Sequence, residues 1–392
     1  MNAARQGVRH VLPALGLLPR DVSTDSVSGL VGAALGFAET ALGWAERVDL
    51  WGLANPVRAY DRYQLGGVQL RGIRPWRLGR VGRHDLRYQL AVGLAAAAAA
   101  RCSILHAHAL PTLLLLPNAE RRVLHLHMAL GQATRLERHL LQRADAVVCA
   151  SEFLAAGFQQ RHPQYPGPVR VIRNGADPNR YADASAGVRL RQHCGLEPAD
   201  RVVAFAGQVA PEKGIHCLIA ALELLPPAER PHLLIAGSSS LWRSVATAGT
   251  EAMTPFEEEL RRRCAGLPVH WLGKLSVGAM PGLLLAADIV CCPSVALEGL
   301  ATINLEAAAA GKPVIASRVG GIPEIVADGV GGILVPPGDI SALARALCRL
   351  RNDASLCRQM GAAARRNVRT WAAAGRELRT VYEQLLDGAA WR

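Results

Sequence analysis

Residues 201–214 read Arg201-Val-Val-Ala-Phe-Ala-Gly207-Gln-Val-Ala-Pro-Glu-Lys213-Gly214, and this stretch decides the fold class. The apolar run 202–206 predicts a buried strand, a glycine follows it, and Lys213-Gly214 opens a stretch with apolar residues at helical spacing. A strand that passes through a short glycine loop into a helix is the unit of a parallel α/β sheet. Such a loop also suits a phosphate, because glycine allows close approach and a helix N-terminus offers unpaired N–H groups. The alternative is a purely structural role, in which the segment is a tight turn and the lysine is solvated.

The same alternation of strands and helices extends in both directions along the chain. Before this stretch we expect strands at 8–15, 48–52, 103–108, 123–127, 146–150 and 169–172, with helices at 30–47, 132–143 and 151–161. After it we expect strands at 232–236, 269–272, 289–292, 313–316 and 332–335, with helices at 214–225, 255–265, 305–310, 340–351 and 355–370. A polar interval, residues 177–200, separates the two series. The pattern predicts two Rossmann-like domains, 1–185 and 186–370, that face each other across a cleft. A last helix within 371–392 is expected to pack back on the N-terminal domain.

Composition limits the classes of protein that the chain can belong to. Half of the 392 residues are hydrophobic and 19% are charged, which excludes wholesale disorder. The first 180 residues hold 22 Arg against 12 Asp and Glu, a net charge of +10. Such a surface attracts anions, but without interleaved aromatics or zinc-ligand spacing nucleic acid is not the expected partner. The nine scattered cysteines predict free thiols and a cytoplasmic location. The longest apolar runs are too short to span a bilayer, so at most a peripheral membrane contact is expected.

A second motif places two carboxylates eight positions apart. Glu298 follows the strand expected at 289–292, Glu306 lies in the next helix, and the backbone N–H groups of residues 299–302 would point out of the first turn of that helix. Carboxylates accept hydrogen bonds from paired hydroxyls, so the pair suits a sugar or a ribose. Taken singly, Glu298 also fits an acid favoured by a helix dipole, and Glu306 a solvent-exposed side chain. A glycine pair at 320–321, followed by Glu324, is a weaker signal of the same kind.

Taken together, these segments resemble the retaining, nucleotide-sugar-dependent glycosyltransferases of family 4, which have the GT-B fold. The resemblance is strongest over 201–340, where "AFAGQVAPEKG", "EGLATINLEAAAAGKPVIAS" and "GGIPEIVADGVGGILVPPGD" follow the family pattern in order. It continues more loosely into "ADAVVCASEFL" and "VIRNGADPNRY".

The resemblance implies a donor site in the C-terminal domain. Lys213 would bind the donor diphosphate, Glu306 the ribose hydroxyls, and Glu298 the hydroxyls of the transferred sugar. Two loops would supply the other donor-binding residues, which are Gly207, Gln208, Gly299, Leu300, Ala301 and Thr302. The nucleotide sugar is a co-substrate, and neither a cofactor nor a metal is expected, since the chain has no Asp-x-Asp motif.

The resemblance also gives roles to histidines of the N-terminal domain. In Val123-Leu-His-Leu-His127 the last histidine would face the donor sugar, so that His127, Lys213 and Glu298 form the expected catalytic set. His125 would share its strand face but lie deeper in the sheet. His106 and His108 match a family strand with structural or acceptor-side roles.

Three positions depart from the family pattern. Gln208 stands where an Arg is usual, so the diphosphate loses one of two cations. Ala301 stands where a glycine is usual, which would narrow the sugar pocket. The glycine-pair loop beside the acceptor is reduced to Ser28-Gly29.

The expected activity is transfer of a hexose, with retention, from a nucleoside diphosphate sugar of the UDP-glucose type. The acceptor is expected to be a glycan or a lipid-linked molecule of cell-surface polysaccharide synthesis. Alternatives are a nucleotide-sugar epimerase, a disaccharide phosphorylase, a glycoside hydrolase that uses the two glutamates, or a non-catalytic nucleotide-sugar-binding relative. A run of six arginines, at 71, 74, 77, 80, 83 and 87, is either an anionic-membrane docking patch or a solvated surface.

Overall fold

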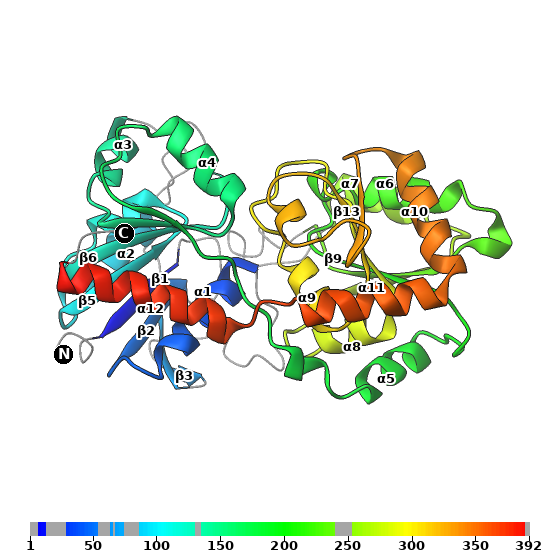
Figure 1. The fold of residues 1–392 in the computed structure, drawn as a ribbon, viewed down its shortest axis with the longest axis horizontal. Helices are drawn as coiled ribbons and strands as arrows, with labels where there is room; N and C mark the ends of the chain where they lie inside the picture. The colour runs from blue at the N-terminus through cyan, green and yellow to red at the C-terminus, as the bar shows by residue number, and fades with distance from the viewer. Residues whose placement is uncertain are drawn as a thin grey trace.

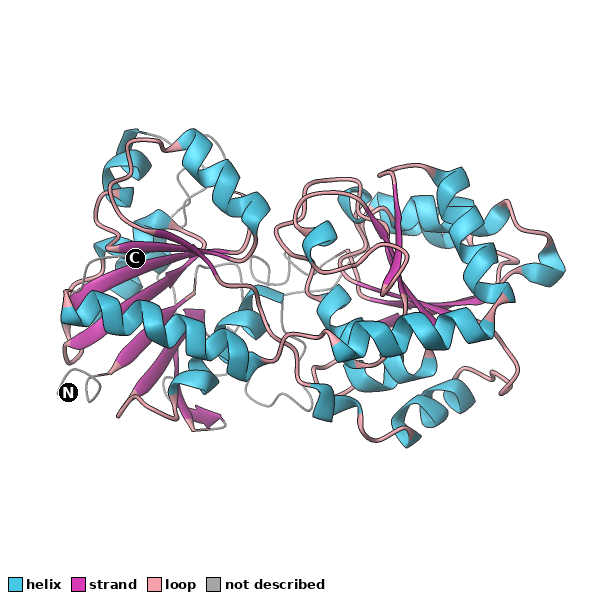
Figure 2. Cartoon of the chain, viewed as in Figure 1, coloured by secondary structure: helices cyan, strands magenta, loops and turns pink. Residues whose placement is uncertain are grey.

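Two parallel sheets, each covered by helices, lie end to end along the long axis of the molecule (Figures 1 and 2). The computed structural model describes residues 7–12, 29–53, 63–65, 67–73, 86–129, 135–239 and 253–388. Strands that alternate with helices along the chain produce this arrangement, since a parallel connection needs a crossover helix on a sheet face.

Among the described residues the first sheet has eight strands in the order β3-β4-β2-β1-β5-β6-β7-β8, and of these only β3 runs antiparallel to its neighbour. These strands are β1 (Val8–Val11), β2 (Val48–Leu53), β3 (Tyr63–Leu65), β4 (Val68–Ile73), β5 (Cys102–His108), β6 (Ala119–Leu126), β7 (Ala146–Cys149) and β8 (Val169–Val171). Its described helices are α1 (Gly29–Ala41), α2 (Leu86–Ala97), α3 (Arg135–Leu141) and α4 (Glu152–Arg161). The strand order reverses at β1, where open α/β sheets form a ligand crevice at the carboxyl ends.

The second sheet has six parallel strands in the order β11-β10-β9-β12-β13-β14. They are β9 (Val202–Ala206), β10 (His232–Ala236), β11 (Val269–Gly273), β12 (Ile289–Cys292), β13 (Val314–Ser317) and β14 (Gly332–Val335). Its helices are α5 (Ser185–His193), α6 (Ile215–Glu223), α7 (Pro255–Arg263), α8 (Met280–Ala286), α9 (Ile303–Ala309), α10 (Ile340–Asn352) and α11 (Ala354–Arg366). The order reverses between β9 and β12, which places the crevice between the loops that follow these two strands.

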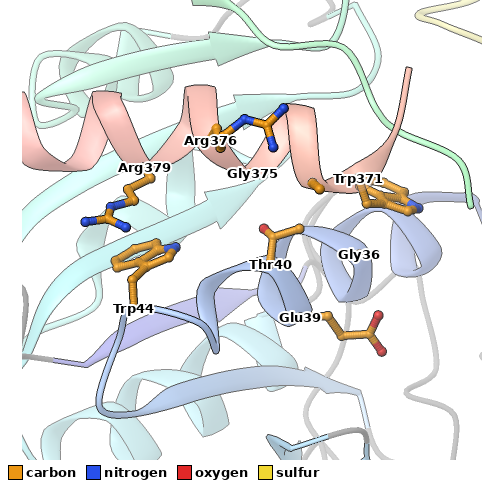
Figure 3. A pocket seen from close by; sticks show the side chains of 9 residues that line it. Gly36, Glu39, Thr40, Trp44, Trp371, Gly375, Arg376 and Arg379 are labelled. Carbon is orange, nitrogen blue, oxygen red and sulfur yellow. The ribbon is translucent and has the colours of Figure 1, made fainter. Parts of the chain in front are cut away.

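The last helix, α12 (Trp371–Asp387), returns from the second sheet and lies beside α1 on the first (Figure 1). The two helices touch closely, because a Cβ on Gly36 would lie 2.6 Å from the Trp371 ring and one on Gly375 would lie 2.4 Å from Thr40. Figure 3 shows a shallow pocket on this seam. None of the residues that line it belongs to the expected donor site; they are Gly36, Glu39, Thr40, Trp44, Trp371, Ala372, Gly375, Arg376 and Arg379.

Most of the elements expected from the sequence occur in the structure, some with different ends: β1 ends at Val11, and α1 ends at Ala41. The polar interval 177–200 contains a helix that the sequence pattern did not indicate, α5, of which only Gly187 is buried. That glycine lies against α8, since a Cβ there would be 2.6 Å from the Leu285 carbonyl carbon. The segments 63–73, 86–97 and 280–286 also form elements that the sequence pattern did not indicate. The exact domain limits, 1–185, 186–370 and 371–392, remain predictions.

None of the helices formed by the described residues combines the length and apolar character needed to cross a bilayer. Ser28 and the arginines at 74, 77, 80 and 83, on which two expectations rest, lie outside the described residues.

Candidate functional site

The loop after β9 holds Lys213 against the loop after β12. It ends in a 3-10 turn, Pro211–Lys213, and Gly214 then begins α6 with φ of +68°. A Cβ on Gly214 would lie 1.8 Å from the carbonyl oxygen of Pro293, which directly follows β12. Only glycine fits both the left-handed backbone and this close approach. The two loops at the reversal point of the second sheet are therefore locked together.

Lys213 and Glu298 form an ion pair across these two loops. The Nζ–Oε1 distance is 2.6 Å, and the same carboxylate oxygen accepts a 2.8 Å hydrogen bond from Ser294 Oγ. Glu298 is 14% exposed and Lys213 34% exposed, so the pair lies at the edge of the crevice and is partly shielded. An anionic ligand in this crevice would compete with Glu298 for the lysine, and a hydroxylated ligand would compete with the lysine for Glu298.

Glu306 lies on α9, the helix that follows the Glu298 loop, and faces a cation from the other side of the domain junction. Arg180 Nη1 is 3.9 Å from Glu306 Oε1, while its Nη2 donates to the Val277 carbonyl at 2.6 Å. Burial raises the pKa of Glu306, and the charge of Arg180 opposes this shift. The sequence analysis did not identify Arg180, although it lies in the quoted segment "VIRNGADPNRY".

The backbone from Gly299 onward contacts the first domain. A Cβ on Gly299 would lie 2.1 Å from the carbonyl oxygen of His127, so the two backbones almost touch. The glycine pair supports this loop from behind: Cβ atoms on Gly320 and Gly321 would lie 2.1 and 2.2 Å from the carbonyl oxygens of Glu298 and Gly299. The weak glycine-pair signal in the sequence therefore marks a close approach between backbones.

The Lys213–Glu298 pair and the contact between Gly299 and His127 bring His127, Lys213 and Glu298 together where the carboxyl ends of the two sheets meet. His127 follows β6, and its Nε2 is 2.9 Å from His108 Nδ1. Burial lowers the pKa of His127 to about 3, so the ring is neutral at physiological pH. His125 lies deeper on the same face, fully buried, with its ring centroid 4.1 Å from that of His127.

The other residues expected at the donor site differ in burial and in backbone conformation. Gly207 and Gln208 are half-buried in the loop after β9. Leu300 is only 3% exposed and contributes its side chain to the core, so only its backbone can meet a ligand. Ala301 has φ of +52°, a left-handed conformation that disfavours any residue with a Cβ. Thr302 caps α9.

A bridge between the domains lies beside Gly299, and the sequence analysis did not foresee it. The Glu324 carboxylate accepts hydrogen bonds from the backbone N–H groups of Glu152 and Phe153, at 2.9 and 2.8 Å, at the N-terminus of α4. It also pairs with Arg173 at 2.8 Å. Ser151 Oγ donates to the Gly299 carbonyl at 2.7 Å. The available signals were the Ser151 cap and the glutamate of the glycine-pair motif.

Comparison with known proteins covers both halves of the chain. The family described as "Glycosyltransferase Family 4" matches residues 32–180, and "Glycosyl transferases group 1" matches residues 189–367. A D-inositol 3-phosphate glycosyltransferase from Corynebacterium glutamicum is 31% identical over 65% of this chain and 61% of its own length. The chain thus aligns with less than two thirds of that relative.

Solved structures match the whole fold. A sucrose-phosphate synthase from Thermosynechococcus elongatus has a TM-score of 0.79 at 22% identity, covering 98% of this chain and 100% of its own. Anabaena Alr3699/HepE in complex with UDP-glucose has a TM-score of 0.73 at 21% identity, covering 97% and 100%. At these identities the likeness concerns the fold, which is the expected GT-B arrangement of two Rossmann-like domains. A glycosyltransferase family model matches each half of the chain, so the chain belongs to the glycosyltransferases that these two models describe, Family 4 and group 1.

Proposed function

We propose that this protein transfers a hexose from a nucleoside diphosphate sugar to an acceptor hydroxyl, with retention of configuration. The observation that carries the proposal is the Lys213–Glu298 pair, 2.6 Å apart, beside the glycine-rich backbone that meets His127. One cation and one carboxylate at a single crevice match the two ends of such a donor, the diphosphate and the sugar hydroxyls. A glycoside hydrolase would have no use for a lysine that occupies one of its two carboxylates.

Donor binding would exchange this internal ion pair for two ligand contacts. The diphosphate takes Lys213, and the released Glu298 carboxylate then accepts hydrogen bonds from the sugar hydroxyls. The exchange limits the desolvation cost, because each charged group leaves one partner only as it gains another. Glu306 accepts hydrogen bonds from the ribose, beside Arg180. Gln208 adds no charge, so Lys213 and the amides of residues 299–302 stabilise the diphosphate.

In the reaction the bond between the anomeric carbon and the diphosphate oxygen breaks, and a bond to the acceptor oxygen forms on the same face. The acceptor proton passes to the departing phosphate oxygen. Lys213 stabilises the charge that develops on that oxygen, which is where preorganised electrostatics lower a barrier most. His127 acts as a neutral group, through its backbone carbonyl or a ring hydrogen bond to the sugar. Its lowered pKa argues against a role as a cation.

The donor is proposed to be of the UDP-glucose type, with GDP-mannose as the second choice. The Anabaena neighbour with the same fold was solved with UDP-glucose, which supports this order. A thermal-shift panel of UDP- and GDP-sugars tests it, since a ligand that binds only the native state stabilises by mass action. We expect a concentration-dependent rise with a UDP-sugar that disappears in Lys213→Met. The control Arg349→Met removes an exposed cation from α10 and should keep the full shift.

Glu298→Ala tests the catalytic assignment. The variant should lose sugar transfer while its melting temperature stays near that of the parent, because Glu298 lies in a loop at the crevice edge. Glu258→Ala, an exposed glutamate on α7, is the matched control and should transfer normally. Unchanged transfer by Glu298→Ala would refute the assignment. Donor turnover that needs no acceptor would favour the epimerase alternative, and donor binding without any turnover would favour the non-catalytic one.

We also propose that the reaction needs no metal ion, and we propose a class of acceptor and a cellular location. Activity should persist in excess EDTA, because Lys213 and backbone amides take the role of a metal at the diphosphate. The acceptor is proposed to be a glycan or a lipid-linked molecule of surface polysaccharide synthesis, met at the inner face of the membrane by a cytoplasmic protein. All nine cysteines are unpaired in the structure, which suits a reducing compartment.

Membrane contact would use the N-terminal domain, where α2 exposes Leu90 and Leu94, and Leu115 is exposed in the turn that packs beside α2. Sedimentation with anionic liposomes at low and high salt tests this. Binding that falls as salt rises supports docking through the arginine-rich segment, and no binding at low salt contradicts it.

A further inference from the structure

Five histidines of the first domain gather on one face of its sheet, and we call them the histidine cluster: His10, His106, His108, His125 and His127. Strand register explains the grouping. His10 lies directly opposite His106 in the β1–β5 pair, and His108 lies opposite His125 in the β5–β6 pair. Residues two apart on a strand share a face, so all five point to one side. Neighbouring rings in the cluster have centroids 4.1 to 5.5 Å apart. The donor site uses only His127 of this cluster.

The first hydrogen-bonded row of the cluster ends at His127. His127 Nε2 is 2.9 Å from His108 Nδ1, and His108 Nε2 is 3.2 Å from His10 Nδ1. His108 thus has one ring nitrogen turned toward His127 and the other held by a histidine behind it. His108 and His10 are fully buried, whereas His127 is half-buried.

The second row lies beside the first and is held from α12. The Tyr382 hydroxyl, on α12, makes a hydrogen bond with His106 Nδ1, and His106 Nε2 is 3.0 Å from His125 Nδ1. The remaining ring nitrogen, His125 Nε2, is fully buried and has no partner among the described residues. Burying a polar nitrogen without a partner is costly, so a group that binds it would remove that cost.

We propose that His108, His125 and His127 bind a divalent transition metal ion of the zinc class. One ring nitrogen from each of the three lies within 4.8 Å of the other two. Tetrahedral coordination at Zn–N distances of about 2.0–2.1 Å brings such nitrogens to roughly 3.3 Å, so the ring nitrogens must move by at most about 1.5 Å relative to one another. His10 and His106 hold the second nitrogens of His108 and His125, as the outer partners of metal-bound histidines do. The site is separate from the diphosphate site, which lies on the second sheet.

The chemistry of the three rings selects the ion. Neutral imidazoles without a carboxylate or thiolate favour zinc, copper, nickel or cobalt, whereas magnesium and calcium require oxygen ligands. Three histidines leave a fourth position for water or an anion. A second triad, of His10, His106 and His108, also satisfies the distance criterion, but it is fully buried. His127 is the one half-buried member of the cluster, so an ion can reach the first triad more readily than the second.

Titration of the metal-free full-length protein with Co²⁺ tests the proposal. We expect one equivalent to bind with the visible absorption of a tetrahedral nitrogen-ligated ion, and Zn²⁺ to displace it. Zn²⁺ should also raise the melting temperature in proportion to its concentration. His127→Gln should weaken binding by more than about 100-fold, beyond the 10–100-fold effect of losing an outer partner. Because His127 is half-buried, this variant should fold, and its circular dichroism spectrum checks that.

Two further variants make the result specific. His232→Gln alters the other histidine pair, His232 with His270 at the edge of the second sheet, and should bind Co²⁺ like the parent. His10→Gln should weaken binding by about 10–100-fold without abolishing it, since His10 is an outer partner. If His10→Gln abolishes binding while His127→Gln binds normally, the ion occupies the deep triad and the proposal is wrong. If the folded parent binds no stoichiometric Co²⁺ or Zn²⁺, the cluster is a hydrogen-bonded network only, and the proposal is likewise overturned.

Discussion

The two sheets share one architecture but present opposite chemistry at their carboxyl ends. The second sheet offers charges on tightly packed glycine loops, with Lys213 paired to Glu298 and Glu306 nearby. The first sheet offers neutral imidazoles that hydrogen-bond to each other, of which His127 alone is half-exposed. We call the carboxyl ends of the strands in the first and second sheets the first and second edges. The second edge is therefore suited to hold an anionic, hydroxylated ligand. The first edge can lie beside that ligand without adding a competing charge. Where the same fold occurs twice, the loops and strand ends decide what each copy does.

The glycines explain why the second edge is so closely built. Gly214, Gly299, Gly320 and Gly321 each lie where a Cβ would come within 2.2 Å of a backbone atom. These contacts fix the loops to one another and to the first domain. At the first sheet, this contact with Gly299 positions the His127 backbone, and a hydrogen bond to the His108 ring positions its side chain.

Gly299→Ala breaks the contact between the two edges and should have the largest effect. The added methyl group would lie 2.1 Å from the His127 carbonyl oxygen, so the edges must separate by about 1 Å. Misplacement on this scale costs about 100-fold in rate, whereas each domain should keep its own core. Steady-state transfer assays and melting curves measure the two effects. Gly43→Ala, where a Cβ meets nothing within 4 Å, is the control. Normal transfer by Gly299→Ala would mean that the two edges do not act together.

Glu324→Ala weakens the bridge that holds the edges together and should have the second largest effect. The carboxylate accepts two backbone hydrogen bonds from the N-terminus of α4 and pairs with Arg173. Bonds to charged groups contribute about 1.5–3 kcal/mol, so we expect about a tenfold loss of kcat/KM and a larger radius in small-angle scattering. Glu229→Ala removes an ion pair with Arg351 at 3.8 Å, within the second domain, and should change neither. An unchanged radius would show that the bridge does not set the domain arrangement.

The sequence predicted the second edge far better than the first, for a physical reason. Glycines and charged residues at the ends of apolar runs are local signals, and Gly207, Lys213 and Glu298 are readable from their immediate neighbours. The histidine cluster depends on strand register, which joins His10 to residues almost 100 positions away. Single residues of the cluster were noted, but nothing in the local pattern indicates that five rings meet.

Contacts across the domain junction could not be predicted from the local sequence pattern either. Arg180 and Glu324 act on partners 126 and about 170 positions away, so their roles appear only once both domains are placed. Helix α5 escaped prediction because it buries one glycine and therefore lacks an apolar stripe. The family resemblance pointed to the loops that we propose bind the donor, but not to the contacts that join them.

Arg180→Met sharpens the comparison by removing the one described cation that reaches Glu306 from across the junction. Its charge lowers the pKa of Glu306, against the rise caused by burial. Without it the pKa of Glu306 rises further, so the acidic limb of the pH dependence of donor binding should move to higher pH. We also expect the donor KM to rise about two- to fivefold, as for a partly exposed pair. Measurement of the donor KM across a range of pH checks both the pH shift and the rise in KM. The control is Arg189→Met, which removes an exposed ion pair with Asp183. A KM that rises equally at every pH would contradict the proposed link to Glu306.

Ala301→Gly restores the glycine that is usual at this position of the second edge, and it should have the smallest effect. Ala301 has φ of +52°, where a Cβ costs about 1–2 kcal/mol. Glycine removes that strain but adds about 0.5–1 kcal/mol of unfolded-state entropy, so the net gain should be about 0.5–1 kcal/mol. Ala362→Gly, on the exposed face of α11, should instead destabilise by about 1 kcal/mol, because a helix interior disfavours glycine. Chemical denaturation of both variants gives opposite signs if the loop is strained. If both variants lose stability equally, the left-handed conformation of Ala301 costs nothing in solution, and the glycine usual at this position serves the ligand rather than the backbone.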